Sequence, residues 1–250
     1  MTAPAIALRH ANLHYASVAF KERSLKALLA RLAGRAGARP RVADIHALKD
    51  VTLDIPAGSR VGVLGPNGAG KSTLLRAIAG LYPLSSGTLE VSGHVRGLFE
   101  LGLGFEPEAT GRENILYRGL LLGLTPREAR AIEAEVVAFA DLGEFIDYPV
   151  RTYSAGMMVR LAFAITTSVS GEVLLIDEVI GAGDAAFMAK ARQRIDDVIA
   201  RSAILVLASH DFSSLTRLCR RGLVLDHGRV VFDGDIDAAI ASYRAAHAIA

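Results

Sequence analysis

The chain has 250 residues, of which 51% are hydrophobic and 22% are charged, and its formal net charge is +2. This composition provides for a large buried core and excludes an intrinsically disordered chain. The single cysteine, Cys219, excludes an intrachain disulfide framework and makes the reducing cytoplasm the expected compartment.

The sequence has no segment with the pattern of a membrane-targeting or membrane-spanning region. Residues 1–9 lack the basic start and the apolar stretch of a secretory signal, so we expect a protein that stays inside the cell. The longest apolar stretch, from Leu161 to Val169, is much shorter than the roughly 20 residues that a membrane span requires. Any role at a membrane is therefore expected to depend on the protein surface or on a partner.

Two short strands are predicted at the start of the chain, with an insertion between them. The strands cover Ala5–Tyr15 and Ala47–Ile55, and the second one ends at the turn of residues 56–58. The insertion covers about residues 16–46. In it, leucines recur at helical spacing and predict an amphipathic helix that ends at residues 34–40: Leu25, Leu28, Leu29 and Leu32.

The insertion is strongly basic. From Lys21 to Arg41 it contains seven Lys or Arg residues and a single acidic residue, Glu22. Such a segment can contact nucleic acid, anionic lipid head groups or an acidic substrate, or it can be an ordinary solvated helix face. Its composition alone does not choose among these interpretations.

A phosphate-binding loop follows the predicted strand Arg60–Leu64. The residues after this strand fit the pattern G-x-x-x-x-G-K-[ST] at every position: Gly65, Pro66, Asn67, Gly68, Ala69, Gly70, Lys71, Ser72 and Thr73. In such a loop the glycines turn backbone N–H groups toward an anion, Lys71 places its charge on the outer phosphates, and the Ser72 hydroxyl suits Mg²⁺. A helix predicted from Thr73 to Ala79 directs its positive end at the same phosphates. We therefore predict a nucleotide site, with a glycine-rich structural turn as the alternative.

The middle of the chain changes from strands to helices. Residues 87–91 and 94–98 are predicted to pair as two strands joined by Ser92 and Gly93. Thr110 and Thr125 are each followed three residues later by a glutamate, which is the capping-box pattern of a helix start. A helical block is therefore predicted to run to about residue 169.

The last third of the chain predicts a buried parallel sheet. The apolar runs Val173–Ile176 and Ala203–Leu207 are separated by a helical stretch, as in parallel strands that are buried on both faces. Leu223–Val231 is predicted to form a hairpin. Together with the earlier elements, this pattern predicts an α/β fold.

Three polar residues follow the ends of these buried strands. Asp177 and Glu178 end the first strand, where ligands gather in parallel sheets. Asp177 would hold Mg²⁺ directly or through water, and Glu178 would activate the water that attacks a γ-phosphate. His210 follows the second strand and could bond a γ-phosphate oxygen. The alternatives are a solvated acidic pair and a structural histidine.

Two further motifs complete a recognisable order. Residues 153–157, Tyr-Ser-Ala-Gly-Met, precede a helix predicted to start near Met158; by itself this turn indicates only a helix cap. Residues 181–184, Gly-Ala-Gly-Asp, follow Glu178. With the phosphate loop, the two carboxylates and His210, this order resembles the nucleotide-binding subunit of an ATP-binding cassette (ABC) transporter over nearly the whole chain.

The resemblance implies a fold and a domain organisation. The fold would be that of a P-loop NTPase (RecA-type), with a parallel-sheet core, an antiparallel β subdomain and an inserted helical subdomain at about residues 103–168. Residues 1–250 would form a single ABC nucleotide-binding domain that binds ATP and Mg²⁺.

The resemblance also implies partners and site residues. Two copies of the chain would dimerise head to tail, so that Ser154, Gly156 and Met157 of one copy reach the γ-phosphate held by the other. An integral membrane transporter subunit would be the other partner, on the cytoplasmic face of the inner or plasma membrane. Coupling to it would run through residues from about Glu100 to Arg118.

Three more positions receive family roles. Asp184 would lie in the D-loop at the dimer interface, His210 would be the switch histidine, and Tyr15 would stack on adenine. Glu100 stands where the family has the Q-loop glutamine, and a carboxylate cannot donate a hydrogen bond as an amide does. Residues 153–157 keep only the serine and the second glycine of the family's LSGGQ signature.

The sequence also resembles the branch of the family that exports O-antigen, capsule and teichoic acid polymers. The resemblance lies in the runs at residues 100–105 and 110–115, the Tyr-Ser-Ala-Gly-Met signature, residues 177–179 with 183–187, and the basic insertion before the phosphate loop. We therefore expect an ATPase subunit that powers export of a lipid-linked polysaccharide, with the basic helix at residues 21–41 facing anionic head groups or the lipid-linked substrate. An exporter of drugs, lipids or peptides is the nearer alternative. An ABC ATPase acting on DNA or ribosomes is the farther one, and no nucleic acid partner is expected.

Overall fold

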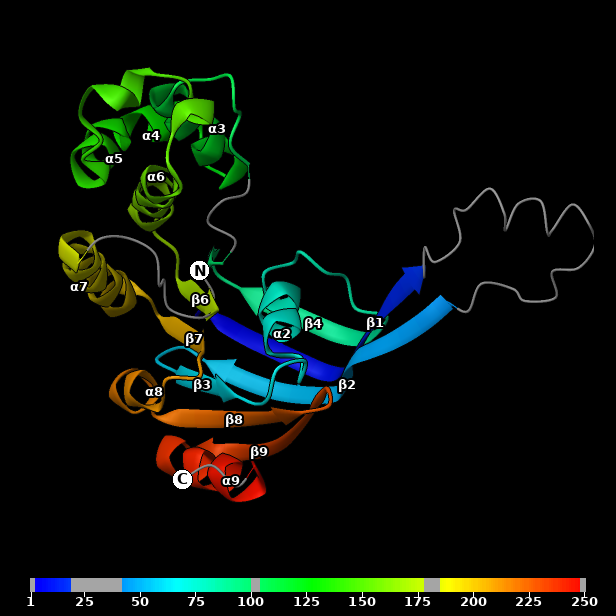
Figure 1. The fold of residues 1–250 in the computed structure, drawn as a ribbon. Helices are drawn as coiled ribbons and strands as arrows, with labels where there is room; N and C mark the ends of the chain where they lie inside the picture. The colour runs from blue at the N-terminus through cyan, green and yellow to red at the C-terminus, as the bar shows by residue number, and fades with distance from the viewer. Residues whose placement is uncertain (1–2, 19–41, 100–103, 178–184, 248–250) are drawn as a thin grey trace, which may run out of the picture.

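The computed structural model describes residues 3–18, 42–99, 104–177 and 185–247. Its centre is a six-stranded sheet in the order β5-β6-β7-β3-β8-β9 (Figure 1). The strands are β3 (Arg60–Leu64), β5 (Val95–Leu98), β6 (Val173–Asp177), β7 (Ile204–Ala208), β8 (Arg221–Asp226) and β9 (Arg229–Asp235). All neighbours pair in parallel except β8 and β9, which form the predicted antiparallel hairpin.

A second sheet lies beside the first and is antiparallel. It consists of β1 (Ala5–Val18), β2 (Val42–Pro56) and β4 (Ser86–Ser92), in the order β2-β1-β4. Both β1 and β2 extend further toward the predicted insertion than the sequence pattern indicated. The leucine pattern that predicts the basic helix lies outside the described residues.

The predicted pairing of residues 87–91 with residues 94–98 is wrong. β4 pairs with β1 in the antiparallel sheet, whereas β5 pairs in parallel with β6 in the central sheet. Gly93, at φ +101°, carries the chain from one sheet to the other. A two-residue connection is short enough for a hairpin, but each strand has a different partner. β4 pairs with β1 at the edge of the antiparallel sheet, and β5 pairs with β6, which places Leu98 in the buried core.

The inserted helices form a separate group at the top of Figure 1. They are α3 (Gly111–Leu121), α4 (Pro126–Ala131), α5 (Glu133–Ala140), the 3₁₀ turns η1 (Gly143–Asp147) and η2 (Val150–Thr152), and α6 (Ala155–Ser168). Both predicted capping boxes are formed, at Thr110 and Thr125. α6 begins at Ala155 rather than near Met158, because the Ser154 side chain caps the helix by accepting a hydrogen bond from the Met157 amide.

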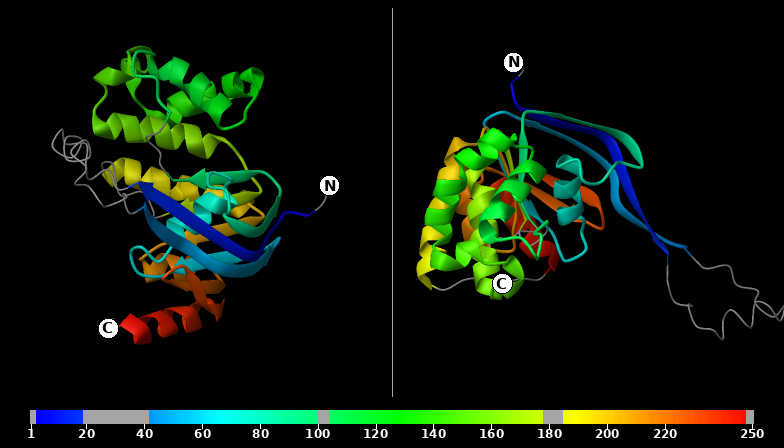
Figure 2. Two further views of the ribbon diagram at one scale, coloured as in Figure 1. Left: turned by 90° about the vertical axis from the view of Figure 1, so that its right-hand side faces the viewer. Right: turned by 90° about the horizontal axis from the view of Figure 1, so that it is seen from above.

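The remaining helices are α2 (Lys71–Ile78), α7 (Ala185–Arg201), α8 (Phe212–Leu218) and α9 (Ile236–His247). α9 lies at the opposite end of the molecule from the helical group, and β1 and β2 extend along another side (Figure 2). Among the described residues, no helix combines the length and the apolar character needed to cross a membrane.

The central sheet is buried on both faces, which explains its continuous apolar strands. Leu205 and Leu207 belong to a core formed with α6, α7, α8 and α9. Val206, between them in sequence, belongs to the second core, formed with α2, β1 and β2. Because successive strand residues point to opposite faces, each face needs its own apolar set. The two cores hold the carboxyl ends of the parallel strands at one edge of the sheet.

Candidate nucleotide-binding site

The loop between β3 and α2 is folded as a cradle for an anion. Gly65, Gly68 and Gly70 have φ values of +151°, +81° and +107°, which residues with a Cβ atom rarely adopt. A Cβ atom on Gly70 would lie 2.7 Å from the Ala47 carbonyl oxygen, whereas one on Gly68 would meet nothing within 4 Å. The loop therefore packs tightly at one side and opens at the other. The free backbone amides of the first turn of α2 lie directly after it.

Lys71 is the first residue of α2, and its side chain turns back into the loop. The residue is 8% exposed, and its Nζ donates hydrogen bonds to the carbonyl oxygens of Gly65 at 2.7 Å and Pro66 at 3.2 Å. The same nitrogen lies 3.3 Å from Nε2 of His210. The loop thus fixes a buried positive charge beside the histidine that follows β7.

The sheet order brings three separately predicted parts of the sequence to this place. β7 lies between β3 and β6, and all three strands are parallel. The phosphate loop follows β3, Asp177 is the last residue of β6, and His210 comes shortly after β7. Ligand sites of open α/β sheets lie outside these carboxyl ends. Asp177, His210 and the loop accordingly line one cavity.

The cavity has a volume of about 830 Å³, within the range of small-molecule sites. Its phosphate end is formed by residues 67–73 with Asp177 and His210. The remaining lining comes from two strands of the antiparallel sheet and one turn: Tyr15, Ile45, His46, Ala47, Lys49, His227 and Gly228. Open space at Gly68, a row of loop amides and the Lys71 ammonium suit a bound phosphate chain, so the residues present fit a nucleotide.

Tyr15, the predicted adenine-stacking residue, lies on β1 and lines this cavity. Its hydroxyl donates a hydrogen bond to Oγ1 of Thr73 at 3.1 Å. Its ring makes a T-shaped contact with that of Tyr82, with centroids 5.5 Å apart and ring planes at 86°. Contacts to Thr73 and Tyr82 hold Tyr15 beside the first turn of α2. From there its ring can reach the base of a nucleotide whose phosphates are bound in the loop.

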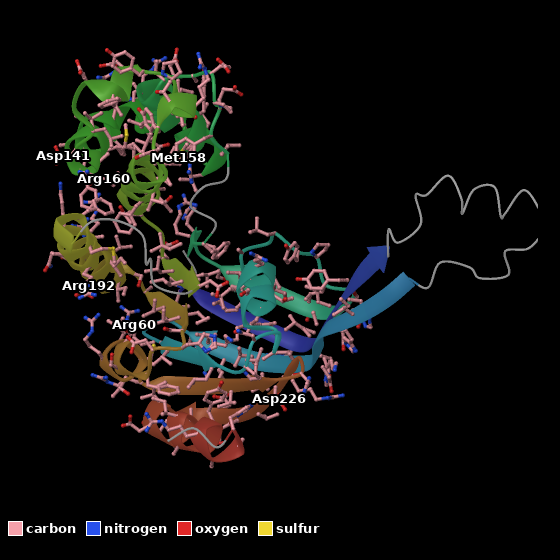
Figure 3. The ribbon with its side chains drawn as sticks, viewed as in Figure 1. Arg60, Asp141, Met158, Arg160, Arg192 and Asp226 are labelled. Atoms are coloured by element: carbon pink, nitrogen blue, oxygen red, sulfur yellow. The ribbon has the colours of Figure 1, made fainter. Side chains whose placement is uncertain are left out.

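The turn between β8 and β9 is a part of the site that sequence reasoning missed. It follows Asp226, labelled at the end of β8 in Figure 3, and its central residues His227 and Gly228 have φ values of +44° and +83°. The Gly228 amide donates to the Ala69 carbonyl at 2.9 Å, and the Gly228 carbonyl accepts from the Lys49 amide at 2.8 Å. The turn therefore ties the phosphate loop to β2. The sequence signals a tight turn here, but no local pattern shows what the turn contacts.

The predicted metal ligands, Ser72 and Asp177, line the same cavity and are each partly exposed. Within the described ranges, no three His, Cys, Asp or Glu side chains cluster so as to hold a metal by themselves. Mg²⁺ commonly uses one or two protein oxygens, completed by phosphate oxygens and water. Ser72 and Asp177 fit that arrangement, because the phosphate cradle lies beside them.

The signature segment lies in a different part of the molecule. Ser154 and Gly156 are exposed at the start of α6, and the Ser154 hydroxyl oxygen accepts from the Met157 amide at 3.2 Å. None of Ser154, Gly156 and Met157 is among the residues that line the cavity. Within one described chain these residues thus present a helix N-terminus to solvent. Glu100, Glu178 and Asp184 lie outside the described residues.

The sequence is similar to those of known transport proteins. The family model described as "ABC transporter" matches residues 48–181. The O-antigen export system ATP-binding protein RfbE of Yersinia enterocolitica is 48% identical over 201 residues, covering 80% of this chain and 84% of that protein. The O-antigen export system ATP-binding protein RfbB of Myxococcus xanthus is 44% identical, covering 82% of this chain and 47% of that protein. The teichoic acids export ATP-binding protein TagH of Bacillus cereus is 36% identical, covering 80% and 36%.

Two solved structures are similar in fold. A dimeric ATP-binding cassette in a post-hydrolysis state, bound to ADP and Pi, has a TM-score of 0.67 at 21% identity, covering 92% of this chain and 98% of that one. An ATP-binding subunit of an ABC transporter has a TM-score of 0.68 at 19% identity, covering 99% and 94%. These likenesses confirm the predicted fold class, with its parallel core, antiparallel sheet and inserted helices.

Proposed function

This chain belongs to the ABC transporter family, and we propose that it is the ATP-binding and ATP-hydrolysing subunit of an exporter of lipid-linked polysaccharide. The observation that carries the proposal is the single cavity that gathers the phosphate loop, Asp177 and His210. Relatives named for O-antigen export and teichoic acids export support the substrate class.

Nucleotide binding would depend mainly on the phosphate loop and α2. Bound Mg²⁺ would neutralise phosphate charge, and Ser72 and Asp177 would hold it. The loop amides and the Lys71 ammonium would stabilise the negative charge that moves onto the outer phosphates during hydrolysis. Tyr15 would support the adenine ring. Apart from the loop amides, these groups belong to α2, β1 and β6, which place them around one cavity.

Hydrolysis would need two further side chains. His210, beside Lys71, would bond a γ-phosphate oxygen and hold the attacking water. Glu178, which follows Asp177 in the sequence, would take the proton of that water as the general base. An imidazole has two ring nitrogens, and in its neutral form one can donate a hydrogen bond while the other accepts one.

A second copy of the chain would complete the site. The exposed start of α6 offers the Ser154 hydroxyl and free amides, which suit an anion that comes from outside the chain. In a head-to-tail dimer, Ser154 and Gly156 would cover the γ-phosphate held by the partner, with Asp184 at the interface. This arrangement accounts for a signature segment that does not line the cavity of its own chain.

A separate membrane subunit would bind the helical group. The outer face of α3 exposes three large apolar or aromatic side chains: Tyr117 and Leu120, each 41% exposed, and Leu121, 73% exposed. Tyr117 belongs to the predicted coupling region, and Cδ1 of Leu121 would lie 3.0 Å from a Cβ atom on Gly104, in the same region. The chain would thus act at the cytoplasmic face of the membrane, and its basic residues 21–41 would face lipid head groups or the lipid-linked substrate.

Reconstituted transport tests this function. The chain is combined with its membrane subunit in vesicles that contain either a lipid-linked polysaccharide, a fluorescent drug or a labelled peptide. We expect ATP hydrolysis by the wild type, stimulated severalfold by the polysaccharide alone and abolished in Glu178→Gln. Stimulation by the drug or the peptide instead would contradict the proposed substrate, and the absence of hydrolysis would contradict the proposed enzyme.

A further inference from the structure

Tyr153 stands directly before the signature serine, and its side chain turns into the helical group. The residue is half-buried, whereas Ser154 and the next two residues are exposed. Its hydroxyl donates a hydrogen bond to the carbonyl oxygen of Phe145 at 2.7 Å. Burial and the nearby Asp147 carboxylate raise the pKa of this hydroxyl, so it stays protonated and keeps its donor. Tyr153 is therefore anchored at its far end, eight residues back along the chain.

The hydroxyl sits on Gly111, the first residue of α3. A Cβ atom built on Gly111 would overlap the Tyr153 hydroxyl oxygen, and it would also lie 3.0 Å from two atoms of Ile146. The Gly111 amide donates to the Tyr148 carbonyl oxygen at 3.3 Å, and its nearness to the Tyr153 hydroxyl opposes the effect of burial on the pKa. Gly111 does not have a positive φ, so only its lack of a side chain explains the glycine. The two residues are complementary in shape.

The segment that leads into α3, residues 106–110, is held in place by several hydrogen bonds. The Asn114 side chain, 0% exposed, donates to the carbonyl oxygens of Glu106, Ala109 and Thr110 and accepts from the Glu106 amide. In addition, the Val150 amide donates to the Ala109 carbonyl at 2.9 Å, and the Arg151 amide donates to the Pro107 carbonyl at 3.0 Å. The segment before α3 and the segment before Ser154 are thus bound to each other along several residues.

We propose that Tyr153 is a positioning residue for the signature serine, and that Gly111 is the matched surface on which its hydroxyl rests. The inference depends on the proposed function, in which Ser154 contacts ATP held by a second copy. A contact of this kind loses strength with small displacements, so the residue before the serine must be held in place. Because the tyrosine ring packs against the start of α3, it fixes the position of the adjacent Ser154 relative to α3 without contacting nucleotide. It also gives a physical role to the aromatic residue that replaces the signature leucine.

The test compares Tyr153→Phe, Gly111→Ala and the double variant, with Tyr148→Phe as the matched control. Tyr148 lies in the same segment but is 48% exposed, with its ring beside Phe145. Measured quantities are kcat at saturating ATP, the Kd of ATP for the isolated chain, the melting temperature, and ATP-dependent dimerisation in a Glu178→Gln background.

Tyr153→Phe should lower kcat and the dimer association constant by about three- to tenfold, since the hydrogen bond that anchors its ring to the Phe145 carbonyl is lost. Its ATP Kd should match that of Tyr148→Phe, and its melting temperature should fall by no more than about 2–4 °C. Gly111→Ala should reduce kcat more strongly in the wild type than in the Tyr153→Phe background, because removing the hydroxyl relieves the overlap. This dependence is a readout that two independent structural roles would not give.

Two results would overturn the positioning role while leaving the proposed function intact: an unchanged kcat in Tyr153→Phe, or effects of the two substitutions that simply multiply. Should Gly111→Ala fail to fold, Tyr153→Phe against Tyr148→Phe decides the question alone. A wild-type chain that neither hydrolyses ATP nor dimerises would overturn the proposed function itself, and this inference with it.

Discussion

The ammonium nitrogen of Lys71 lies 3.3 Å from Nε2 of His210, which joins the first turn of α2 to the end of β7. The two residues are far apart in the sequence and were assigned to separate motifs. Because of this contact, the Lys71 ammonium, which would bind phosphate, and the His210 imidazole, which would contact the γ-phosphate, lie side by side in the cavity.

Replacing Lys71 with methionine should weaken nucleotide binding. The side chain keeps a similar length but loses the charge, and hydrogen bonds to charged groups contribute about 1.5–3 kcal/mol, or roughly 10- to 150-fold in affinity. Titration calorimetry with ATP and Mg²⁺ measures the effect. Since Lys71 also bonds the Gly65 and Pro66 carbonyls, a melting curve checks that the loop remains folded. An unchanged Kd would contradict the assigned phosphate contact.

Replacing His210 with alanine should lower kcat rather than affinity. The histidine would act on the γ-phosphate and the attacking water, so we expect a loss of about 100-fold in kcat with an ATP Kd within about threefold of the wild type. Steady-state hydrolysis and equilibrium binding are measured on the same preparation. His247→Ala, in the exposed end of α9, is the control for loss of an imidazole. A variant that loses affinity and kcat in equal proportion would be inconsistent with a sensor role.

Gly228→Ala should destabilise the chain and loosen the phosphate loop. Gly228 has a φ of +83°, and its Cβ atom would lie 2.7 Å from the Ala47 carbonyl oxygen. Gly58 has the same φ but nothing within 4 Å of a Cβ atom, which makes Gly58→Ala a matched control. The left-handed backbone alone costs about 1–2 kcal/mol in both variants. Urea unfolding should show a larger loss for Gly228→Ala, together with weaker ATP binding; equal losses would show that the turn has no role in holding the loop.

The β8–β9 turn shows which contacts can be predicted from the sequence and which cannot. The phosphate loop and the Thr110 capping box are local patterns within short stretches of sequence. The capping box forms at the predicted residues, whereas α2 begins at Lys71, two residues before the predicted start at Thr73. Gly228 acts through Ala69 and Lys49, which lie far from it in sequence. The same reason explains the error at residues 87–98. The short connection is a local pattern, but the pairing of β4 with β1 and of β5 with β6 depends on strands that are distant in the sequence.

Cys219 should be unreactive in the folded chain. Burial raises the pKa of its thiol to about 12, so below that pH the nucleophilic thiolate is scarce and also inaccessible. The unfolded thiol ionises at lower pH; the stability that the buried neutral thiol contributes is thus fully present below about pH 9 and is lost as the pH rises toward 12. At pH 8, a thiol reagent should label the native chain at least about 100-fold more slowly than the chain in urea. Cys219→Ala provides the blank, and rapid native labelling would contradict the burial.

Leu121→Asp should separate membrane coupling from catalysis. Leu121 is 73% exposed on α3, beside the less exposed Tyr117 and Leu120, so an aspartate there is solvated in the isolated chain and costs little stability. In the proposed complex it would place a charge in a desolvated apolar contact, which opposes binding by several kcal/mol unless the charge is paired. We expect wild-type ATP hydrolysis by the isolated variant but at least about 100-fold weaker association with the membrane subunit, measured by co-purification and by titration in detergent. Val231→Asp on β9, 59% exposed and remote from α3, is the control for an added surface charge. Equal retention of the membrane subunit by both variants would exclude this face of α3 as its docking surface, while reduced hydrolysis by the isolated Leu121→Asp chain would show that the substitution acts within the subunit instead.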